Sequence, residues 1–259
     1  MRLFYGFKIG KTDNFSFILN PNDKYISETL LHGTIWESYV KILLYLLVNE
    51  NDTVVDVGAN IGVHTLNLSR LVGNQGVVHS FEPVPLLFTQ LAYHCLLNNC
   101  MNVKLYQVGL NDTETVSFVP RISEDDMKEK INWGNTKLDN DNISGVKIQT
   151  KTLDQLNLNP QLIKIDVECM ELNVLKGMKQ TIDRSRPFII IEIQPDGKEE
   201  VKKFIQEIDC CIYSIWITAK VYKYDYVLVP IEKHDFFKQK ITNLNYPCLK
   251  LDFLPVKEK

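Results

Sequence analysis

The sequence of 259 residues is poor in cysteine and has no long hydrophobic run. Six cysteines are too few for a disulfide scaffold, and the adjacent Cys210 and Cys211 form neither a CxxC redox motif nor a zinc knuckle. The densest apolar stretches, Ile42–Val48 and Phe188–Ile193, are far shorter than the roughly 20 residues that cross a bilayer. Glycine and lysine interrupt the N-terminus before any signal-peptide core develops. We therefore expect a cytoplasmic protein with reduced thiols and no membrane span.

An excess of basic residues is also missing, because 29 Lys and Arg stand against 32 Asp and Glu, a formal charge of -3. A nucleic-acid binder would need a basic stripe, so we expect no nucleic-acid partner. With 45% hydrophobic and 24% charged residues, the composition is that of an ordinary globular protein, which excludes global disorder. The length is sufficient for one large domain or two small ones.

From residue 51 onward, short β-rich runs alternate with helical stretches. Runs typical of buried strands occupy residues 53–57, 76–81, 103–108, 162–167 and 187–193, and helical patterns occupy residues 61–71, 85–97 and 172–180. Such alternation is typical of a parallel sheet with helices on both faces. We therefore expect a doubly wound, mostly parallel α/β fold.

Three segments lie outside this pattern. Residues 1–50 contain two short strand-like pieces and an amphipathic helix, and we expect them to cover the site as an N-terminal addition to a core at 51–230. A polar insertion at 120–145 is either a surface loop or a lid over the site. Residues 231–259 form a C-terminal extension. We see no internal repeat and no clear linker, so one domain with additions is the simpler organisation.

A glycine turn follows the first core strand. The strand ends with Asp56, and Gly58 and Ala59 then allow a ligand to approach the backbone closely. The following helix would present free amide groups at its N-terminus, beyond the carboxyl ends of the strands where ligands bind in such sheets. The alternative is a tight strand-to-helix turn without a ligand.

The next strand ends at Glu82, beside this turn. A carboxylate there can accept hydrogen bonds from both hydroxyls of a ribose, which suits NAD as well as S-adenosylmethionine. The G-x-G-x-x-G dinucleotide fingerprint is absent, and Asp56 would repel a pyrophosphate while suiting the positively charged end of S-adenosylmethionine. The charge pattern therefore favours S-adenosylmethionine as the cofactor.

A third strand ends with two carboxylates, Asp166 and Glu168. At the carboxyl end of a parallel strand they are poorly placed for a purely structural role. The alternative is an ion pair with Lys164 or a neighbouring base.

Taken together, these segments resemble the successive motifs of the FkbM-type methyltransferases. The matching stretches are Asp56–Gly62, Phe81–Pro83, Gly109–Asp112, Thr152–Asp154, Lys164–Glu168 and Arg186–Glu192, in the family's order. The resemblance implies a seven-stranded class I methyltransferase (Rossmann-like) sheet and S-adenosylmethionine-dependent methylation of a hydroxyl oxygen on a sugar, a glycan or another small molecule. It also implies cofactor contacts from Asp56, Gly58, Ala59, Asn60, Glu82, Leu110, Asn111 and Asp166, with Leu110 and Asn111 near the adenine.

The chain departs from the family pattern at Cys169, where the family has glycine after the second acidic residue. A glycine there leaves room at the wall of the site, so the cysteine puts the size of the substrate in question. A nucleophilic role for Cys169 is not expected, because methyl transfer needs no covalent enzyme intermediate and a small buried cysteine is common.

The acceptor hydroxyl must lose a proton as the new bond forms, and a positioned base accelerates such a step by about 10²–10⁴-fold. Our candidates for this base are Asp166 and Glu168, followed by His64 in the first turn of the helix after the glycine turn. Asp166, Glu168 and Glu192 could bind Mg²⁺, but we expect that no metal is required.

Two other functions stay open. A nicotinamide-dependent oxidoreductase would use the same turn and Glu82, although a Tyr-x-x-x-Lys pair is not evident. A non-catalytic protein that keeps the cofactor fold would be favoured only by Cys169.

Overall fold

The computed structural model describes residues 6–12, 14–123, 125–130, 132–134, 144–193, 198–207, 213–218, 225–242 and 251–254. The expected insertion at 120–145 therefore lies partly outside the described residues, as do Cys210 and Cys211. No helix of the described residues is long and apolar enough to cross a membrane.

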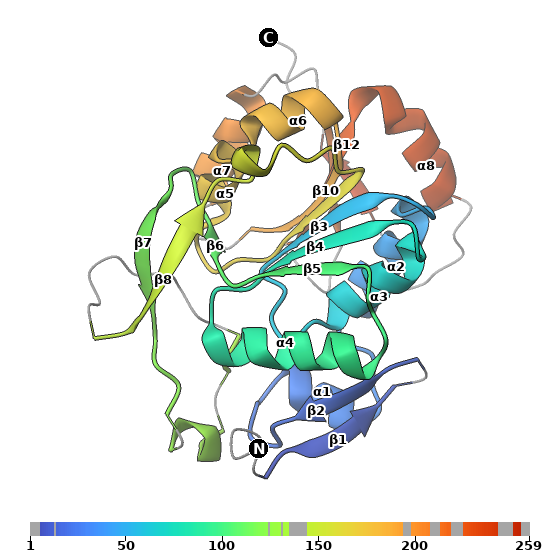
Figure 1. Cartoon of the computed structure of the whole chain (residues 1–259). Helices are drawn as coiled ribbons and strands as arrows, with labels where there is room; N and C mark the ends of the chain where they lie inside the picture. The colour runs from blue at the N-terminus through green and yellow to red at the C-terminus, as the bar shows by residue number, and fades with distance from the viewer. Residues whose placement is uncertain are drawn as a thin grey trace.

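An eight-stranded sheet forms the centre of the molecule (Figure 1). Its order is β13-β11-β12-β10-β9-β3-β4-β5, and the pairs from β10 to β5 are parallel whereas β12, β11 and β13 are added antiparallel. The strands are β3 (Thr53–Val57), β4 (Val77–Phe81), β5 (Val103–Tyr106), β9 (Leu162–Ile165), β10 (Phe188–Glu192), β11 (Tyr213–Thr218), β12 (Asp225–Pro230) and β13 (Leu251–Leu254). The mostly parallel α/β fold is thus confirmed, but the described sheet has eight strands instead of the expected seven. The eighth strand, β13, comes from the segment expected to extend beyond the core.

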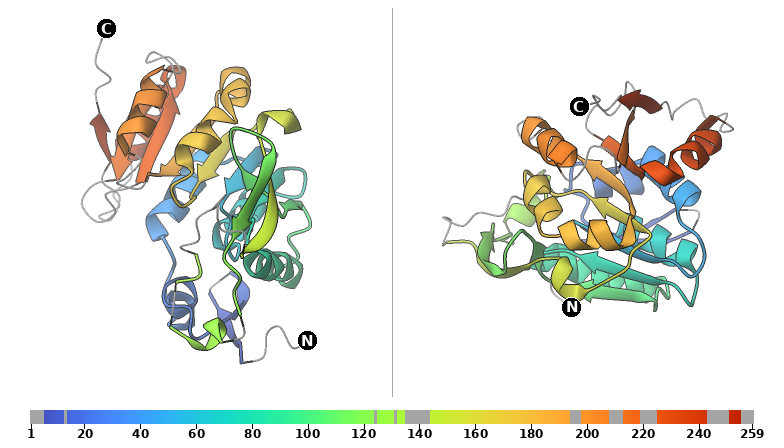
Figure 2. Two further views of the ribbon diagram at one scale, coloured as in Figure 1. Left: turned by 90° about the vertical axis from the view of Figure 1, so that its left-hand side faces the viewer. Right: turned by 90° about the horizontal axis from the view of Figure 1, so that it is seen from above.

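Helices lie on both sides of the central sheet (Figure 2). Alternating side chains of the central strands divide the core into two layers. Val55, Ile163 and Ile189 pack with residues of α5 (Glu171–Lys176), α6 (Lys179–Ser185) and α7 (Lys198–Glu207). Their neighbours Val54, Leu162 and Ile190 pack instead with residues of α2 (Ser38–Leu47), α3 (Val63–Val72) and α8 (His234–Thr242). Because successive side chains of a strand point to opposite faces, these two clusters lie on opposite sides of the sheet.

The order of the strands reverses between β3 and β9, which are adjacent in the sheet but distant in the sequence. From β3 the chain proceeds to β4 and β5, and β9 and β10 lie on the other side of β3. Such a reversal opens a crevice beyond the carboxyl ends of the strands. Asp56, Glu82, Asp166 and Glu192 all lie at or directly after these ends.

A third apolar cluster joins the N-terminal segment to the core. It brings together Phe17 of the hairpin, Ile61 after the glycine turn, Leu91 of α4 and Trp133 of the insertion. The hairpin strands are β1 (Lys8–Lys11) and β2 (Ser16–Leu19), followed by α1 (Ile26–Leu31), and α4 spans Pro85–Leu97 with proline in its first turn. The hairpin lies under α4, away from the C-terminal strands (Figure 1).

Hydrogen bonds through His94 connect this hairpin to the turn near the crevice. His94 of α4 accepts the Ile18 amide at Nε2 (2.9 Å), and its Nδ1 lies 2.7 Å from the Ile61 carbonyl oxygen. The remaining elements are a small sheet of β6 (Gly109–Leu110), β8 (Val146–Lys151) and β7 (Thr115–Val119), and the 3₁₀ turns η1 (Asp126–Lys128), η2 (Asp154–Leu156) and η4 (Ile231–Lys233).

Candidate functional site

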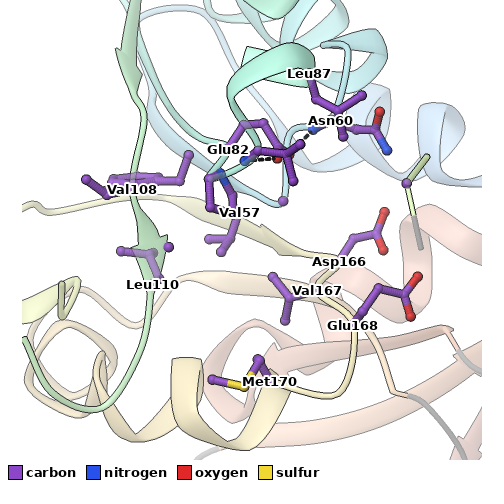
Figure 3. A pocket seen from close by; sticks show the side chains of 16 residues that line it. Val57, Asn60, Glu82, Leu87, Val108, Leu110, Asp166, Val167, Glu168 and Met170 are labelled. Atoms are coloured by element: carbon purple, nitrogen blue, oxygen red, sulfur yellow. Dashed lines mark hydrogen bonds between the residues drawn. The ribbon is translucent and has the colours of Figure 1, made fainter. Parts of the chain in front are cut away.

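A pocket opens at the carboxyl ends of β3, β4 and β9, where the strand order reverses (Figure 3). It has about 650 Å³ of space, counting the part open to solvent. It is lined by Val57, Gly58, Asn60, Phe81, Glu82, Pro83, Val84, Leu87, Val108, Gly109, Leu110, Gly134, Asp166, Val167, Glu168 and Met170. A volume of this order suits a small-molecule ligand.

The two ends of the pocket differ in polarity. One end carries apolar side chains, among them Val108 and Leu110. At the other end, Asn60, Asp166 and Glu168 direct their polar groups to the same side, as Figure 3 shows. The pocket therefore suits an elongated ligand with a flat or apolar part at one end and a polar, positively charged part at the other.

The glycine turn brings the backbone of β3 against that of β9. Gly58 has φ +74°, and a methyl group added to its Cα would lie 1.8 Å from the carbonyl oxygen of Asp166. Only glycine fits such a close approach, and its lack of a Cβ also removes the strain of a positive φ. Asn60 adopts φ 51°, and its Oδ1 accepts a hydrogen bond from the Ile61 amide.

The backbone amides of this turn all donate hydrogen bonds within the chain. Gly58 and Ala59 both donate to the Phe81 carbonyl (3.0 Å each), and Gly62 donates to the Ala59 carbonyl (2.8 Å). The Asn60 amide donates to Glu82 (2.8 Å) and the Ile61 amide to the Asn60 side chain (2.8 Å). Free amides were expected at the N-terminus of the following helix, and this helix, α3, begins at Val63, after the bonded residues 58–62.

Glu82 lies buried in the wall of the pocket. Its Oε2 accepts the Asn60 amide and its Oε1 accepts the Val84 amide, both at 2.8 Å. Burial raises the pKa of this carboxyl to about 7, although the two amides act in the opposite direction. Each carboxylate oxygen has a second lone pair, so Glu82 can still accept hydrogen bonds from a bound ligand.

The other predicted cofactor residues fall into two groups. Gly58, Asn60, Glu82, Leu110 and Asp166 line the pocket, whereas Asp56, Ala59 and Asn111 are not among the lining residues.

The positions of the last three have plain physical causes. Asp56 has no exposed surface, and its Oδ2 accepts the Thr65 hydroxyl at 2.6 Å. Ala59 packs in the apolar cluster under the turn. Asn111 is buried, and its Oδ1 accepts the side-chain amide of Asn173 at 3.0 Å.

Two of the three candidate bases, Asp166 and Glu168, lie together at the polar end of the pocket. Lys164 is also present, with its Nζ 3.0 Å from Asp166 Oδ2, so the ion pair considered from the sequence does form. His64 is buried at the start of α3, outside the lining, with its Nε2 2.8 Å from Glu37 Oε2.

A polar network that the sequence analysis did not assemble continues from Asp166 along the edge of the sheet. Glu192 hydrogen-bonds to Asp166, and burial together with the charge of Asp166 raises the pKa of Glu192. Asp225 lies opposite Glu192 in the neighbouring strand and accepts the Tyr39 hydroxyl at 2.8 Å. Burial, followed by the charge of Glu37, raises the pKa of Asp225 to about 7.

Two residues of the insertion, for which the sequence left a surface loop and a lid as alternatives, lie at or beside the pocket. Gly134 of the insertion lies over Asn60, since a methyl group on it would come within 2.6 Å of the Asn60 Nδ2. Trp133 beside it is buried in the third apolar cluster. The part of the insertion that the structure describes thus reaches the pocket.

Cys169 lies between two lining residues but is itself exposed and not part of the lining. Its φ is 60°, in the left-handed region that glycine adopts without strain. The structure therefore explains a glycine at this position by backbone conformation, and not by the space at the wall that the sequence analysis assumed.

Among the residues that the structure describes, no group of three or more His, Cys, Asp or Glu side chains is placed to hold a metal ion.

The fold and the pocket define an α/β protein with a pocket at the switch point of its sheet. The family model described as the methyltransferase FkbM domain matches residues 56–246, and the chain belongs to this family. Two named relatives are a methyltransferase 1 of Beauveria bassiana, 29% identical over 66% of this chain and 75% of its own length, and the hexuronic acid methyltransferase AglP of Haloferax volcanii, 28% identical over 64% of this chain and 66% of its own length.

A crystal structure of methyltransferase FkbM from Methylobacillus flagellatus is also similar, at 18% sequence identity and a TM-score of 0.49. The match covers 71% of this chain and 47% of that protein.

Proposed function

We propose that this chain is an S-adenosylmethionine-dependent O-methyltransferase that acts on a hydroxyl of a sugar, a glycan or another small molecule. Membership of the FkbM family supports methyl transfer. The observation that carries the choice of donor is the pocket, which places the buried Glu82 between an apolar end and an acidic end. The hexuronic acid methyltransferase among the relatives supports a sugar acceptor.

The residues present fit this donor. Val108 and Leu110 would face the adenine, and the free lone pairs of Glu82 would accept the ribose hydroxyls. Asp166 and Glu168 would face the positively charged methionine end. When bound, S-adenosylmethionine supplies an activated methyl group on a cationic sulfur.

Positioning supplies much of the catalysis of an in-line displacement. The chain's own contribution would be to hold an acceptor hydroxyl at the polar end of the pocket and to remove its proton. Lys164 holds the pKa of Asp166 below its usual range despite the burial of that group, which makes Asp166 a weak base. Glu168, which lines the same end, is therefore our first choice for the base, while His64 lies outside the lining.

A nicotinamide-dependent oxidoreductase has less support. Dinucleotide sites hold the pyrophosphate with free backbone amides at a helix N-terminus. In this chain Asp166 and Glu168 line the pocket and would repel phosphate. A non-catalytic role was favoured only by Cys169, and Cys169 is not part of the lining of the pocket.

Calorimetry on the purified chain would test the donor. We expect S-adenosylmethionine to bind and NADH not to bind. Glu82→Gln should weaken binding by about 1–3 kcal/mol, the scale of a lost hydrogen bond to a charged group. The matched variant Glu50→Gln, at an exposed position, should bind S-adenosylmethionine as the wild type does. Binding of NADH alone would overturn the proposal.

Transfer of a labelled methyl group to a panel of neutral sugars, uronic acids and glycans, followed by mass analysis of the product, would test the acceptor. We expect the label on a hydroxyl oxygen. Label found on nitrogen or carbon would refute O-methylation while leaving the donor assignment intact.

A further inference from the structure

A lysine lies buried in the middle of the central sheet. Lys164 is on β9, and its side chain is only 5% exposed. Taking an ammonium group out of water costs several kcal/mol, and apolar residues of similar volume often serve stability as well or better. Stability alone therefore does not explain why a lysine occupies position 164.

The lysine is at the end of a polar row that crosses three strands. Ser80 of β4 pairs with Asp56 of β3, and Asp56 pairs with Lys164 of β9, so the three side chains share one face of the sheet. The Thr65 hydroxyl of α3 lies 2.6 Å from Asp56 Oδ2 and 3.0 Å from Ser80 Oγ. Asp56 is thus fixed by its neighbours, and its Oδ1 lies 3.6 Å from the Lys164 ammonium.

The row ends at the pocket. The Lys164 ammonium lies 3.0 Å from Asp166 Oδ2, and the Asp166 side chain is 32% exposed and lines the polar end. Asp166 is thereby the one carboxylate of this ion-paired group that reaches the pocket lining, whereas Asp56 is fully buried.

We propose that Lys164 is a positioning residue, anchored by Asp56, that holds Asp166 as an ionised carboxylate facing the site of the donor's cationic end. The inference rests on the proposed function for the identity of the donor. It assigns Asp56 an indirect role, because Asp56 fixes the lysine and does not touch the ligand.

The charges around Asp166 show why the lysine is needed. Asp56 on β3, Glu192 on β10 and Asp225 on β12 are acidic, as is Glu37 before α2, and His64 of α3 adds a positive charge only when protonated. Burial favours a protonated Asp166, whereas the hydrogen bond from Glu192 favours its ionised form. The charge of Lys164 opposes burial more strongly than this hydrogen bond does, and it holds the pKa of Asp166 below its ordinary range.

The test compares two ligands that differ in one charge. S-adenosylmethionine carries a sulfonium, whereas S-adenosylhomocysteine has a neutral sulfur, and both dissociation constants would be measured by calorimetry at pH 6 and pH 9. In Lys164→Met, Asp166 should take up a proton at pH 6. We expect the affinity for S-adenosylmethionine to fall about tenfold more than that for S-adenosylhomocysteine at this pH, and to recover at pH 9 as the proton is lost.

Two further variants make the test specific. The double variant Asp56→Asn/Lys164→Met has one carboxylate fewer and should lose less affinity at pH 6 than Lys164→Met. Lys179→Met, at an exposed position, should match the wild type. If Lys164→Met keeps the wild-type ratio of the two affinities at both pH values, the lysine is merely structural and the inference fails.

If the proposed function is wrong, the result is different, because the wild-type chain would then bind neither ligand. The inference about Lys164 would be refuted together with the proposed function. If Lys164→Met does not fold, carbon NMR of the wild-type carboxyls, with Asp166 assigned through Asp166→Asn, decides the matter. The pKa of Asp166 should lie below the ordinary value of about 3.9, and titration at or above that value would overturn the inference.

Discussion

The two halves of the sheet's carboxyl edge hold their acidic side chains in different ways. Beside β3 and β4, Glu82 is held by the backbone amides of Asn60 and Val84. Beside β9, β10 and β12, carboxyls are held by other side chains, and Asp225 accepts the hydroxyl of Tyr39, which is 186 positions away. The first half is therefore fixed by backbone groups, and the second by side chains.

This difference has a functional consequence. Backbone amides fix the shape of the half that would bind the nucleoside, and a mutation of a side chain elsewhere leaves them in place. The half around Asp166 depends on Lys164 and Glu192, so its charge changes when any one member changes. Substitutions should thus act on shape in the first half and on charge in the second.

The largest effect is expected at the polar end of the second half. Glu168→Gln should lower the rate of methyl transfer by about 10²–10⁴-fold, because glutamine cannot take the proton of the acceptor hydroxyl. Donor affinity should fall much less than the rate, although Glu168 also faces the cationic end of the donor. Single-turnover transfer of a labelled methyl group would measure the rate, with the exposed Glu50→Gln as the control. An unchanged rate would exclude Glu168 as the base.

The same contrast explains what the sequence could predict. The glycine turn and Glu82 follow one another along the chain, so their meeting at one edge could be predicted from the strand-helix alternation. The position of Asp225 could not, because it depends on β12 pairing antiparallel with β10. Nor could the sequence show that Asp56 lies behind the wall, since burial depends on the side chains of Thr65 and Lys164 packed against it.

Gly58 lies where the two halves touch. Gly58→Ala should destabilise the fold by about 3 kcal/mol, because it adds a methyl group 1.8 Å from the Asp166 carbonyl oxygen at a positive φ. Gly33→Ala is a matched control, since Gly33 has φ +71° with nothing within 4 Å. Urea unfolding would measure the free energy of unfolding of both variants. An equal decrease in the two variants would mean that the close contact at Gly58 does not contribute to the destabilisation.

Asp225 tests the charge of the second half through the pH dependence of stability. Its pKa is about 7 in the folded chain, so the folded state keeps a proton that the unfolded state has released. The free energy of unfolding of the wild type should therefore decrease, relative to Asp225→Asn, as the pH rises from about 4 to 7. We expect a difference of about 2 kcal/mol by urea unfolding at pH 4.5 and pH 7.5.

The exposed Asp183→Asn is the control for this measurement and should follow the wild type at both pH values. If the free energy of unfolding of Asp225→Asn changed with pH as that of the wild type does, Asp225 would have the same pKa in the folded and unfolded chain.

The smallest effect is expected at Cys169, which directly follows Glu168 in the second half. Its φ of 60° costs about 1 kcal/mol for a residue with a Cβ, and glycine removes this cost but loses more entropy on folding. Cys169→Gly should thus raise the free energy of unfolding by about 0.5–1 kcal/mol. Asn99→Gly, at φ 56°, should gain less because asparagine tolerates this conformation. Donor affinity should not change, since Cys169 is not part of the lining. If Cys169→Gly altered donor affinity without raising the free energy of unfolding, the cysteine would narrow the site, as the sequence suggested.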